Sequence, residues 1–171
     1  MDNFTNDVID TKQLPRFEEV KFEALHPYYW KVIMLNLLIF YIIIFGAAAV
    51  VWYFNPEVRL YLLEVFGGLL FLSIIIFWIS RISFAKKGYA FRTHDVLFRS
   101  GIISTNTTII PYNRVQHVAL NEGLIMRRFG LSEIGIYTAG ASGSDLEIPG
   151  IAKEEAESIK QLLMGKIQKT L

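Results

Sequence analysis

The chain contains 171 residues, of which 53% are hydrophobic and 19% are charged, whereas ordinary soluble domains have about 25% charged residues. This length allows one domain, or a membrane anchor with one small domain. Two long apolar runs favour the second arrangement, which excludes a soluble enzyme and a large multidomain assembly. Because the chain has no cysteine, disulfides, thiolate zinc sites and cysteine nucleophiles are excluded as well.

The net charge of +1 is distributed unevenly along the chain. Residues 1–31 contain four Lys/Arg and six Asp/Glu, whereas residues 81–171 contain twelve Lys/Arg and eight Asp/Glu. A positive excess of this size suits a domain beside anionic lipid and is too small for a nucleic-acid-binding protein. We therefore expect the lipid bilayer, and no nucleic acid, among the partners.

The apolar runs cover residues 32–53 and 60–80 and predict two transmembrane helices. Each exceeds the ~18 apolar residues that mark a membrane-spanning helix. Two buried helices of a soluble bundle are the alternative, but such helices keep a polar stripe. Because residues 55–59 alone interrupt the pattern, a tight antiparallel hairpin is expected. The chain then divides into an N-terminal segment (1–31), a transmembrane hairpin (32–80) and a block of 91 residues (81–171).

Basic residues flank the two spans mainly on one side, and Arg59 alone lies in the outer loop. Cytoplasmic flanks of membrane proteins carry such an excess of Lys and Arg. The basic residues on the inner side are Lys21, Lys31, Arg81, Lys86, Lys87 and Arg92. We therefore expect a multi-pass protein with both termini and residues 81–171 in the cytoplasm.

Small residues recur at matching depths in the two spans. If the turn centres on residue 57, Gly46 lies opposite Gly68 and Ala47 lies opposite Gly67. Small residues let two helix backbones approach closely in lipid. Packing within the hairpin is one interpretation, and contact with a helix of a partner protein is the other.

Two polar residues, Asn36 and Glu64, lie within the spans. A carboxylate inside the membrane is costly and is a candidate functional group. Glu64 is about one turn below the outer interface, so snorkelling to water or a helix-packing hydrogen bond also explains it. Asn36 is near the opposite face and too distant to be its partner. A transporter or a proton pathway is therefore not favoured.

After residue 81 the pattern changes to short β-rich runs broken by turn residues. The expected strands are 88–92, 96–100, 105–111, 115–120, 133–139 and 145–148. A short helix is expected at 124–129, ended by Gly130, and residues 140–144 are expected to form a loop. An amphipathic helix from about 152 to 168 closes the chain. The predicted fold is a transmembrane α-helical hairpin followed by an α+β domain, a small β-barrel or sandwich capped by a C-terminal helix.

Five motifs occur in an order typical of one family. They are Leu25-His26-Pro27 before Tyr28-Tyr29-Trp30-Lys31, then Ile110-Pro111-Tyr112-Asn113-Arg114-Val115-Gln116-His117-Val118, Arg127-Arg128-Phe129-Gly130-Leu131, Tyr137-Thr138-Ala139-Gly140 and Ile148-Pro149-Gly150-Ile151. Together they resemble the YdbS-like bacterial membrane proteins that carry a pleckstrin-homology (PH) domain. This resemblance implies a PH-like fold for residues 81–171 and a location in the bacterial inner membrane.

The resemblance also implies a kind of partner. Members of the family often occur beside a larger membrane protein built from related domains. This favours a hetero-oligomer with a second membrane protein of the family, or self-association, and a role in envelope maintenance or resistance to membrane-active stress.

Catalysis receives little support from the sequence. His26, His94 and His117 show no metal-ligand spacing. No serine elbow, phosphate loop or carboxylate constellation is found. We therefore expect a non-enzymatic protein without catalytic, cofactor-binding or metal-binding residues.

Contact with lipid is the first candidate for the surface of the domain. PH domains that bind inositol lipids carry several basic residues around a roomy first hairpin. The corresponding hairpin here is short and offers only Arg92 and Arg99, and Asp95 would oppose a phosphate. Lys86, Lys87 and Arg92 are instead the candidates for non-specific contact with anionic lipid.

A protein-binding edge is the second candidate. Its residues would be Arg114, Gln116, His117, Arg127 and Arg128. Structural roles are equally consistent for the arginines, because cations stabilise the last turn of a helix and an arginine can close a turn. The leading hypothesis is thus an interaction subunit of a membrane complex, and the alternative is an anionic-lipid-binding or lipid-handling protein. A channel component that uses Glu64 is the third.

Overall fold

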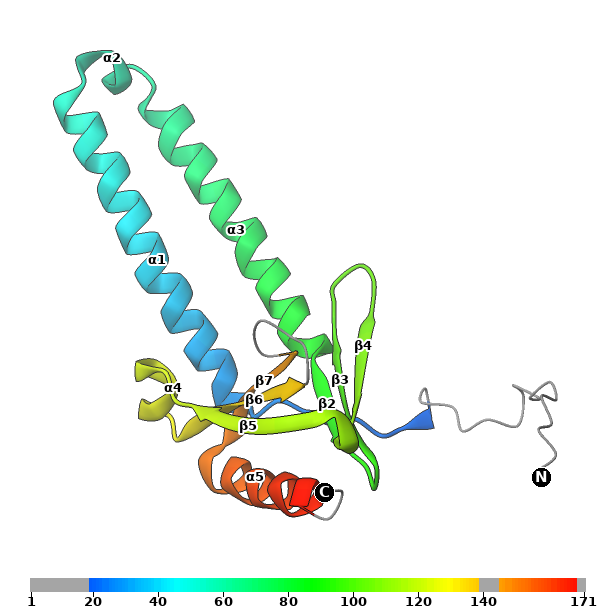
Figure 1. Ribbon diagram of the computed structural model, residues 1–171. Coiled ribbons are helices and arrows are strands. Elements are labelled where there is room, and N and C mark those ends of the chain that lie inside the picture. Colours follow the sequence, from blue (N-terminus) through cyan, green and yellow to red (C-terminus); the bar gives the residue numbers. More distant parts are fainter. Residues whose placement is uncertain (1–18, 139–144, 169–171) are drawn as a thin grey trace, which may run out of the picture.

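Two long helices, α1 (Pro27–Phe54) and α3 (Leu62–Lys86), rise from a β-rich domain in the computed structural model, which describes residues 19–138 and 145–168 (Figure 1). A short helix, α2 (Pro56–Arg59), lies at the far end of the hairpin. At 1.5 Å per residue, α1 and α3 are about 42 and 37 Å long, which exceeds the ~30 Å of the hydrocarbon core. Of their most apolar windows, only 6% and 0% is buried, unlike the core helix of a soluble protein. Both helices therefore suit a membrane and extend past its surface.

Both helices are longer than the apolar runs that predicted them. α1 begins at Pro27 rather than 32, and α3 continues to Lys86 rather than 80. Proline at the first helical position loses no hydrogen bond, and Nδ1 of His26 caps the helix by accepting a bond of 3.2 Å from the Tyr28 N–H. The extra turns contain basic and other polar side chains, which interrupt the continuous apolar pattern.

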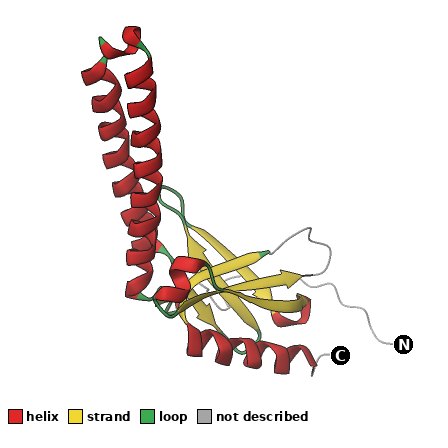
Figure 2. Ribbon diagram, turned by 90° about the vertical axis from the view of Figure 1, so that its left-hand side faces the viewer, coloured by secondary structure: helices red, strands yellow, loops and turns green. Residues whose placement is uncertain are grey.

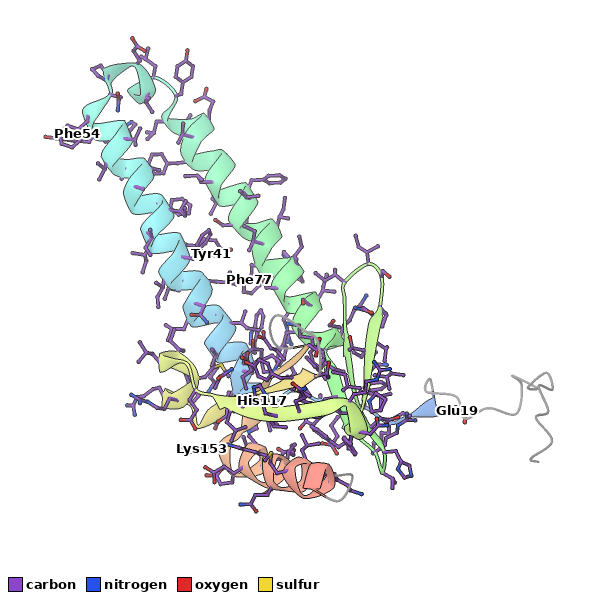
Figure 3. All side chains as sticks on the ribbon, viewed as in Figure 1. Glu19, Tyr41, Phe54, Phe77, His117 and Lys153 are labelled. Carbon is purple, nitrogen blue, oxygen red and sulfur yellow. The ribbon has the colours of Figure 1, made fainter. Side chains whose placement is uncertain are left out.

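The hairpin is held together by large side chains. The hydroxyl of Tyr41 donates to the carbonyl oxygen of Ser73 at 2.9 Å, and Figure 3 shows Tyr41 lying between the two helices. The rings of Phe45 and Phe66 lie 6.3 Å apart, and that of Trp30 lies 5.7 Å from the ring of Phe84. Tyr41 and Ser73 are equally far along the chain from residue 57. They therefore face each other at the depth expected for a turn centred on that residue.

The small residues of the spans do not make the expected contact. Gly46, Ala47, Gly67 and Gly68 are all exposed. A Cβ atom added to any of these three glycines would meet no other atom within 4 Å. Aromatic residues such as Phe45 occupy the facing surfaces instead, so the glycines lie on the outer faces of the hairpin.

The domain consists of two open antiparallel sheets rather than a closed barrel. The first has the order β1-β2-β3-β4 and the second β5-β6-β7. Their strands are β1 (Glu23–Ala24), β2 (Gly88–Phe91), β3 (Asp95–Ser100), β4 (Asn106–Pro111), β5 (Val115–Asn121), β6 (Leu131–Thr138) and β7 (Leu146–Ala152). The remaining elements are a 3-10 turn η3 (Tyr112–Arg114), α4 (Leu124–Arg128) and α5 (Lys153–Gln168). The PH-like pattern of strands followed by one helix is thus confirmed.

Most predicted strands agree with the structure to within two residues, whereas β7 continues four residues beyond its expected end, through Pro149 and Gly150. An edge strand tolerates proline, because its N–H is not needed for pairing. Gly130, with a positive φ of 64°, ends α4 as predicted. The stretch 140–144, expected to be a loop, lies outside the described residues.

The first strand comes from the segment that precedes the spans. Glu23 and Ala24 pair with Tyr89 and Gly88 of β2, and Leu25 is buried in the core. The sequence predicts residues 1–31 as a separate segment, because a two-residue strand leaves no periodic signal. In the structure this segment completes the first sheet, so the two spans lie within the connection between β1 and β2.

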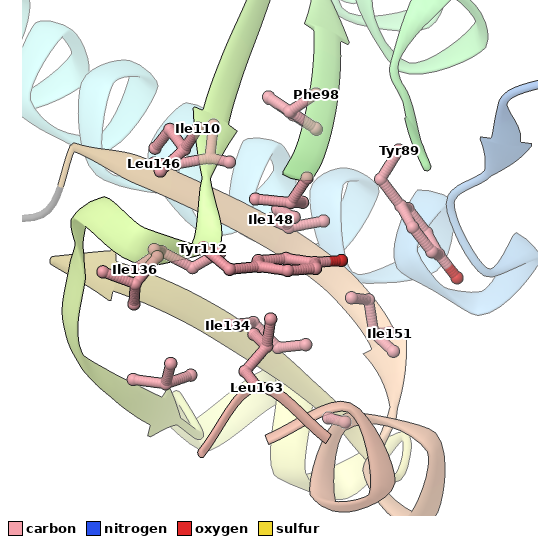
Figure 4. Close-up of a cluster of buried hydrophobic side chains, with 14 of the residues drawn as sticks. Tyr89, Phe98, Ile110, Tyr112, Ile134, Ile136, Leu146, Ile148, Ile151 and Leu163 are labelled. Carbon is pink, nitrogen blue, oxygen red and sulfur yellow. The ribbon is translucent and has the colours of Figure 1, made fainter. Parts of the chain in front are cut away.

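The core lies between the two sheets and α5 (Figure 4). Ile134, Ile136 and Ile148 are fully buried at its centre, and Ala156 and Leu163 contribute the apolar face of α5. α5 covers the side of the domain away from the spans (Figure 2). Turns and α4 therefore form the side of the domain that faces the spans.

Candidate functional site

The junction between the spans and the domain is closely packed. The backbone N–H of His26 donates to the carbonyl oxygen of Gly150 at 2.9 Å. Gly150 has a φ of +70°, and a Cβ atom there would lie 2.4 Å from Cγ of Tyr29. Leu25 and Val32, on either side of this contact, are buried. The first span is thus fixed against β7, and motion of the hairpin is coupled to the domain.

Aromatic and basic side chains pair at the base of the hairpin. The guanidinium of Arg81 lies 5.0 Å from the ring of Trp30 and 5.8 Å from that of Phe84. The ammonium of Lys31 lies 4.5 Å from the ring centroid of Tyr28. Such pairs are typical of the membrane–water interface, where an aromatic body meets lipid and a charge meets water.

Lys86 and Lys87 end the second span, at the membrane side of the domain. Lys86 is exposed, and its Nζ donates to the carbonyl oxygen of Ile102 at 2.5 Å. Lys87 is partly buried, and its N–H bonds to the carbonyl oxygen of Phe84. Their position is compatible with contact to anionic lipid, which stays a prediction for both.

Arg92 occupies a different place from these lysines. It follows β2, in the turn to β3 beside the C-terminal end of α5 (Figure 1). Its Nε donates to Oδ1 of Asp95 at 2.6 Å, and its Nη2 pairs with Oδ2 of the same carboxylate. Asp95 accordingly raises the pKa of the Arg92 guanidinium. Arg92 closes this turn at the end of the domain away from the spans, which argues against its assignment to the lipid-proximal group.

The same turn is also bonded to Tyr112, which follows β4. The hydroxyl of Tyr112 donates to the carbonyl oxygen of Arg92 at 2.7 Å, and burial, together with the nearby charge of Asp95, raises the pKa of Tyr112 to about 12. The β2–β3 hairpin is not at the edge of the first sheet, because β2 also pairs with β1 and β3 with β4.

Three of the partner-surface candidates lie around the start of β5. Arg114 is exposed and lines an open cavity of about 440 Å³ with Ile110, Asp145 and neighbouring residues. Gln116 and His117 are also exposed, and the register of β5 shifts between Val115 and His117. The ring of His117 stacks on that of Tyr137, with centroids 4.1 Å apart.

The other two partner-surface candidates lie at the opposite end of β5. Arg127 and Arg128 are exposed in the last turn of α4. This helix lies beside the base of α1 (Figure 1), and the ring of the following Phe129 lies 6.5 Å from that of Tyr28. The five predicted residues therefore form two separate patches rather than one surface.

The intramembrane polar residues are both exposed. Glu64 is the acidic residue in the first turn of α3. A carboxylate at this position is stabilised by the positive end of the helix dipole. This is a structural reason for Glu64 that needs no proton pathway, and Asn36 lies at the other end of the hairpin on α1.

The remaining ionic contacts are structural. Nζ of Lys153 lies 3.0 Å from Oε1 of Glu122, which also accepts a hydrogen bond of 3.3 Å from the buried Ser132. Lys153 lowers the pKa of Glu122 and so ties the start of α5 to the end of β5. Among the described residues, no group of three or more His, Asp or Glu could hold a metal ion.

Several contacts of the site left no signal in the sequence. The packing of Tyr29 on Gly150 joins residues more than a hundred positions apart. The Tyr89 hydroxyl donates to Oε1 of Glu155 at 2.9 Å, which links β2 to α5. The bond from Lys86 to the carbonyl oxygen of Ile102 likewise joins the end of α3 to a turn sixteen residues later.

Comparison with known proteins gives a consistent result. A family model described as "Bacterial PH domain" matches residues 22–167. The transmembrane protein YdbS of Bacillus subtilis (strain 168) is 27% identical over 121 residues, which cover 70% of this chain and 73% of that protein. The transmembrane protein YdbT of the same organism is 31% identical over 117 residues, or 66% of this chain but only 22% of that larger protein. No solved structure matches.

Proposed function

Because this chain belongs to the bacterial PH domain family, as a YdbS-like membrane protein, we propose that it is a non-enzymatic interaction subunit of a membrane complex. Its two spans would bind a partner within the bilayer, and its PH-like domain would be presented on the cytoplasmic side. The excess of basic residues next to the inner ends of the spans supports this orientation. For a bacterial protein, the membrane would be the inner membrane.

One observation carries the proposal. The glycines of the spans face outward, and no atom lies within 4 Å of a Cβ position at Gly46, Gly67 or Gly68. The hairpin itself is held by Tyr41 and by aromatic contacts. Outward-facing small residues allow the backbone of another helix to approach closely. They therefore favour a helix of a second protein, or of a second copy, beside the hairpin.

The relatives support a partner from the same family. YdbS and YdbT come from one organism, and this chain resembles about a fifth of the longer YdbT. A larger protein that contains a related segment is a suitable partner for a small one. By resemblance to the family, the complex would serve envelope maintenance or resistance to membrane-active stress.

Co-purification in mild detergent tests the proposal. We expect a second membrane protein, or a second copy, to purify in fixed ratio with the tagged chain. Gly67→Leu combined with Gly68→Leu should remove it, because the added side chains fill the outer face without a clash inside the hairpin. Val50→Leu, at an exposed apolar position on the other span, α1, is the control. Loss of the partner in both variants, or retention in both, would contradict the role of the glycines.

A second candidate function is the binding or handling of anionic lipid. Lys86, exposed at the membrane side of the domain beside Lys87, favours it. Charge reversal of both lysines to glutamate should then release a copurifying anionic lipid and leave any protein partner in place. An unchanged lipid content, measured by mass spectrometry, would argue against this function.

A further inference from the structure

The turn between β3 and β4 points toward the membrane. Gly88, two residues after the end of α3, pairs with Arg99 near the end of β3. The chain then continues past this pair into residues 101–105, so the turn extends beyond the start of β2 on the side of the spans. Figure 1 shows it rising beside the lower part of α3. The bond from Lys86 to the carbonyl oxygen of Ile102 holds it there.

The composition of this turn is unusual for a loop in water. Residues 100–113 contain no charged side chain and no histidine, although the domain around them is rich in both signs of charge. Turns normally consist of polar residues, yet Ile102 and Ile103 occupy the tip. The side chain of Ile103 is 101% exposed, which is full exposure, and Ile109 on β4 is 40% exposed.

The shape of the turn is fixed by its backbone. Gly101 has a φ of +127°, and a Cβ atom there would lie 1.9 Å from the carbonyl oxygen of Ser104. Only glycine fits this position, so the chain folds back tightly and leaves Ile103 at the outermost point. With Lys86 bonded to the neighbouring carbonyl, the height of Ile103 along α3 is defined.

That height corresponds to the surface of the bilayer. The apolar run of α3 ends near residue 80, so Lys86 lies about 9 Å beyond the hydrocarbon core at 1.5 Å per residue. The headgroup layer extends about 5–8 Å beyond the core on each side. A turn that rises from the level of Lys86 toward the spans therefore enters this layer.

We propose that the β3–β4 turn is a third membrane contact, in which Ile102 and Ile103 insert into the interfacial layer of the bilayer beside α3. The lower part of α3 also carries exposed apolar side chains, such as Ile79 and Ile82. The absence of charge over residues 100–113 lets the turn approach lipid without burying an ion. Together with α1 and α3, this contact would fix the tilt of the domain relative to the membrane.

The absence of cysteine in the chain makes a direct test practical. Single-cysteine variants would carry one nitroxide label each in lipid nanodiscs that hold one copy of the full chain. Ile103→Cys reports on the turn, Leu70→Cys on a lipid-facing site of α3, and Leu162→Cys on α5; Leu70 and Leu162 are 57% and 50% exposed. Collision rates with oxygen, which concentrates in lipid, and with a polar nickel chelate, which stays in water, are measured for each.

We expect nickel access at 103 at least threefold below that at 162, and an oxygen-to-nickel ratio between those at 162 and 70, because residue 70 lies at the middle of the span and residue 103 at the interface. Nickel access equal to that at 162 would place the turn in water and overturn the proposal. Low access to both reagents would show that protein, such as a second copy, covers the turn, which would also overturn it.

A second pair of variants separates insertion from a local change in shape. With the label at Ser104→Cys, Ile103→Asp should raise nickel access, because a carboxylate is expelled from the interface. Ile103→Leu is the matched control and should leave it unchanged. Equal access in both variants would contradict the insertion of residue 103.

Discussion

Gly150 is part of β7 and also packs against Tyr29 at the start of the first span. Its φ of +70° and the ring of Tyr29, 2.4 Å from a Cβ position, both exclude a side chain. The left-handed backbone alone costs a non-glycine residue about 1–2 kcal/mol, and the clash adds to this. Tyr29 or β7 would have to move to relieve it, and the junction between span and domain would loosen.

We therefore predict that Gly150→Ala destabilises the protein by about 2 kcal/mol or more. Gly165→Ala, in α5, is the control, since no atom lies within 4 Å of its Cβ position. Alanine is favoured over glycine inside a helix by about 0.5–1 kcal/mol, so this variant should be neutral or stabilising. Thermal unfolding in detergent measures both, and equal midpoints would contradict the prediction.

The hydrogen bond between Tyr89 and Glu155 makes stability depend on alkaline pH. Burial first, and then the carboxylate of Glu155, raise the pKa of Tyr89 above its ordinary value of 10. A group with a raised folded pKa contributes stability that is complete below pH ~10 and is lost as the pH rises further. The folded state should therefore weaken above about pH 10, where tyrosine in the unfolded chain ionises.

Tyr89→Phe tests this linkage. The variant should lose about 1 kcal/mol at neutral pH, the usual value of a hydrogen bond, and should show a shallower loss of stability above pH 10. Urea unfolding at pH 8 and at pH 10.5 measures the difference. Tyr137→Phe, on the surface stack with His117, is the control and should keep the alkaline dependence of the parent.

Among the described elements, β1 is the shortest, yet it joins the segment before the spans to the domain after them. It pairs with β2 and brings Leu25, only 3% exposed, into the core. Truncation of a buried leucine to alanine typically costs 2–5 kcal/mol. Leu25→Ala should therefore destabilise the domain by about this amount, although the residue precedes the spans. Lys21→Ala, at an exposed position just before the same strand, should change the unfolding midpoint little.

Elements with a strong local pattern could be predicted from the sequence, and those that depend on distant partners could not. Alternating residues and turn signals located β3, β4 and β5, and the period of Ala156, Ile159 and Leu163 located α5. β1 was missed because two residues show no period and its partner lies after both spans. The depth of Gly46 and Gly68 in the membrane could be predicted by counting residues from the turn. The helix face on which they lie could not, because it depends on which side chains pack between the two helices.

The same distinction applies to the candidate site. Lys86 and Lys87 could be placed near the membrane, because they follow the second span directly. Arg92 could not, since the direction of β2 decides that it lies at the far end of the domain. The direction of the turn at Ile103 could not be predicted either, because it depends on the register of β2 with β3.

In the whole molecule, the domain is assembled from two stretches of chain separated by the spans. Because Ala24 and Gly88 are neighbours across β1 and β2, their ends can be joined without the hairpin. We predict that residues 87–168 alone do not fold stably, since they lack β1 and Leu25. A chain in which residues 19–26 are joined to 87–168 through a short Gly-Ser linker should fold as a soluble domain.

Dispersion of amide resonances in NMR spectra distinguishes these two chains. The joined chain should give a well-dispersed spectrum and a cooperative unfolding transition, and the shorter chain should give neither. Equal dispersion in both would mean that β1 is dispensable. The joined chain with Leu25→Asp is a control of identical length that should not fold.

The position of β1 also sets an order of events during synthesis. β1 leaves the ribosome before either span, whereas β2 is translated only after both, so the first strand must wait unpaired while the hairpin is inserted. The two strands can meet only if both ends of the hairpin remain on the same side of the membrane. Completion of the sheet would therefore occur only in chains whose hairpin was inserted with both ends on one side of the membrane.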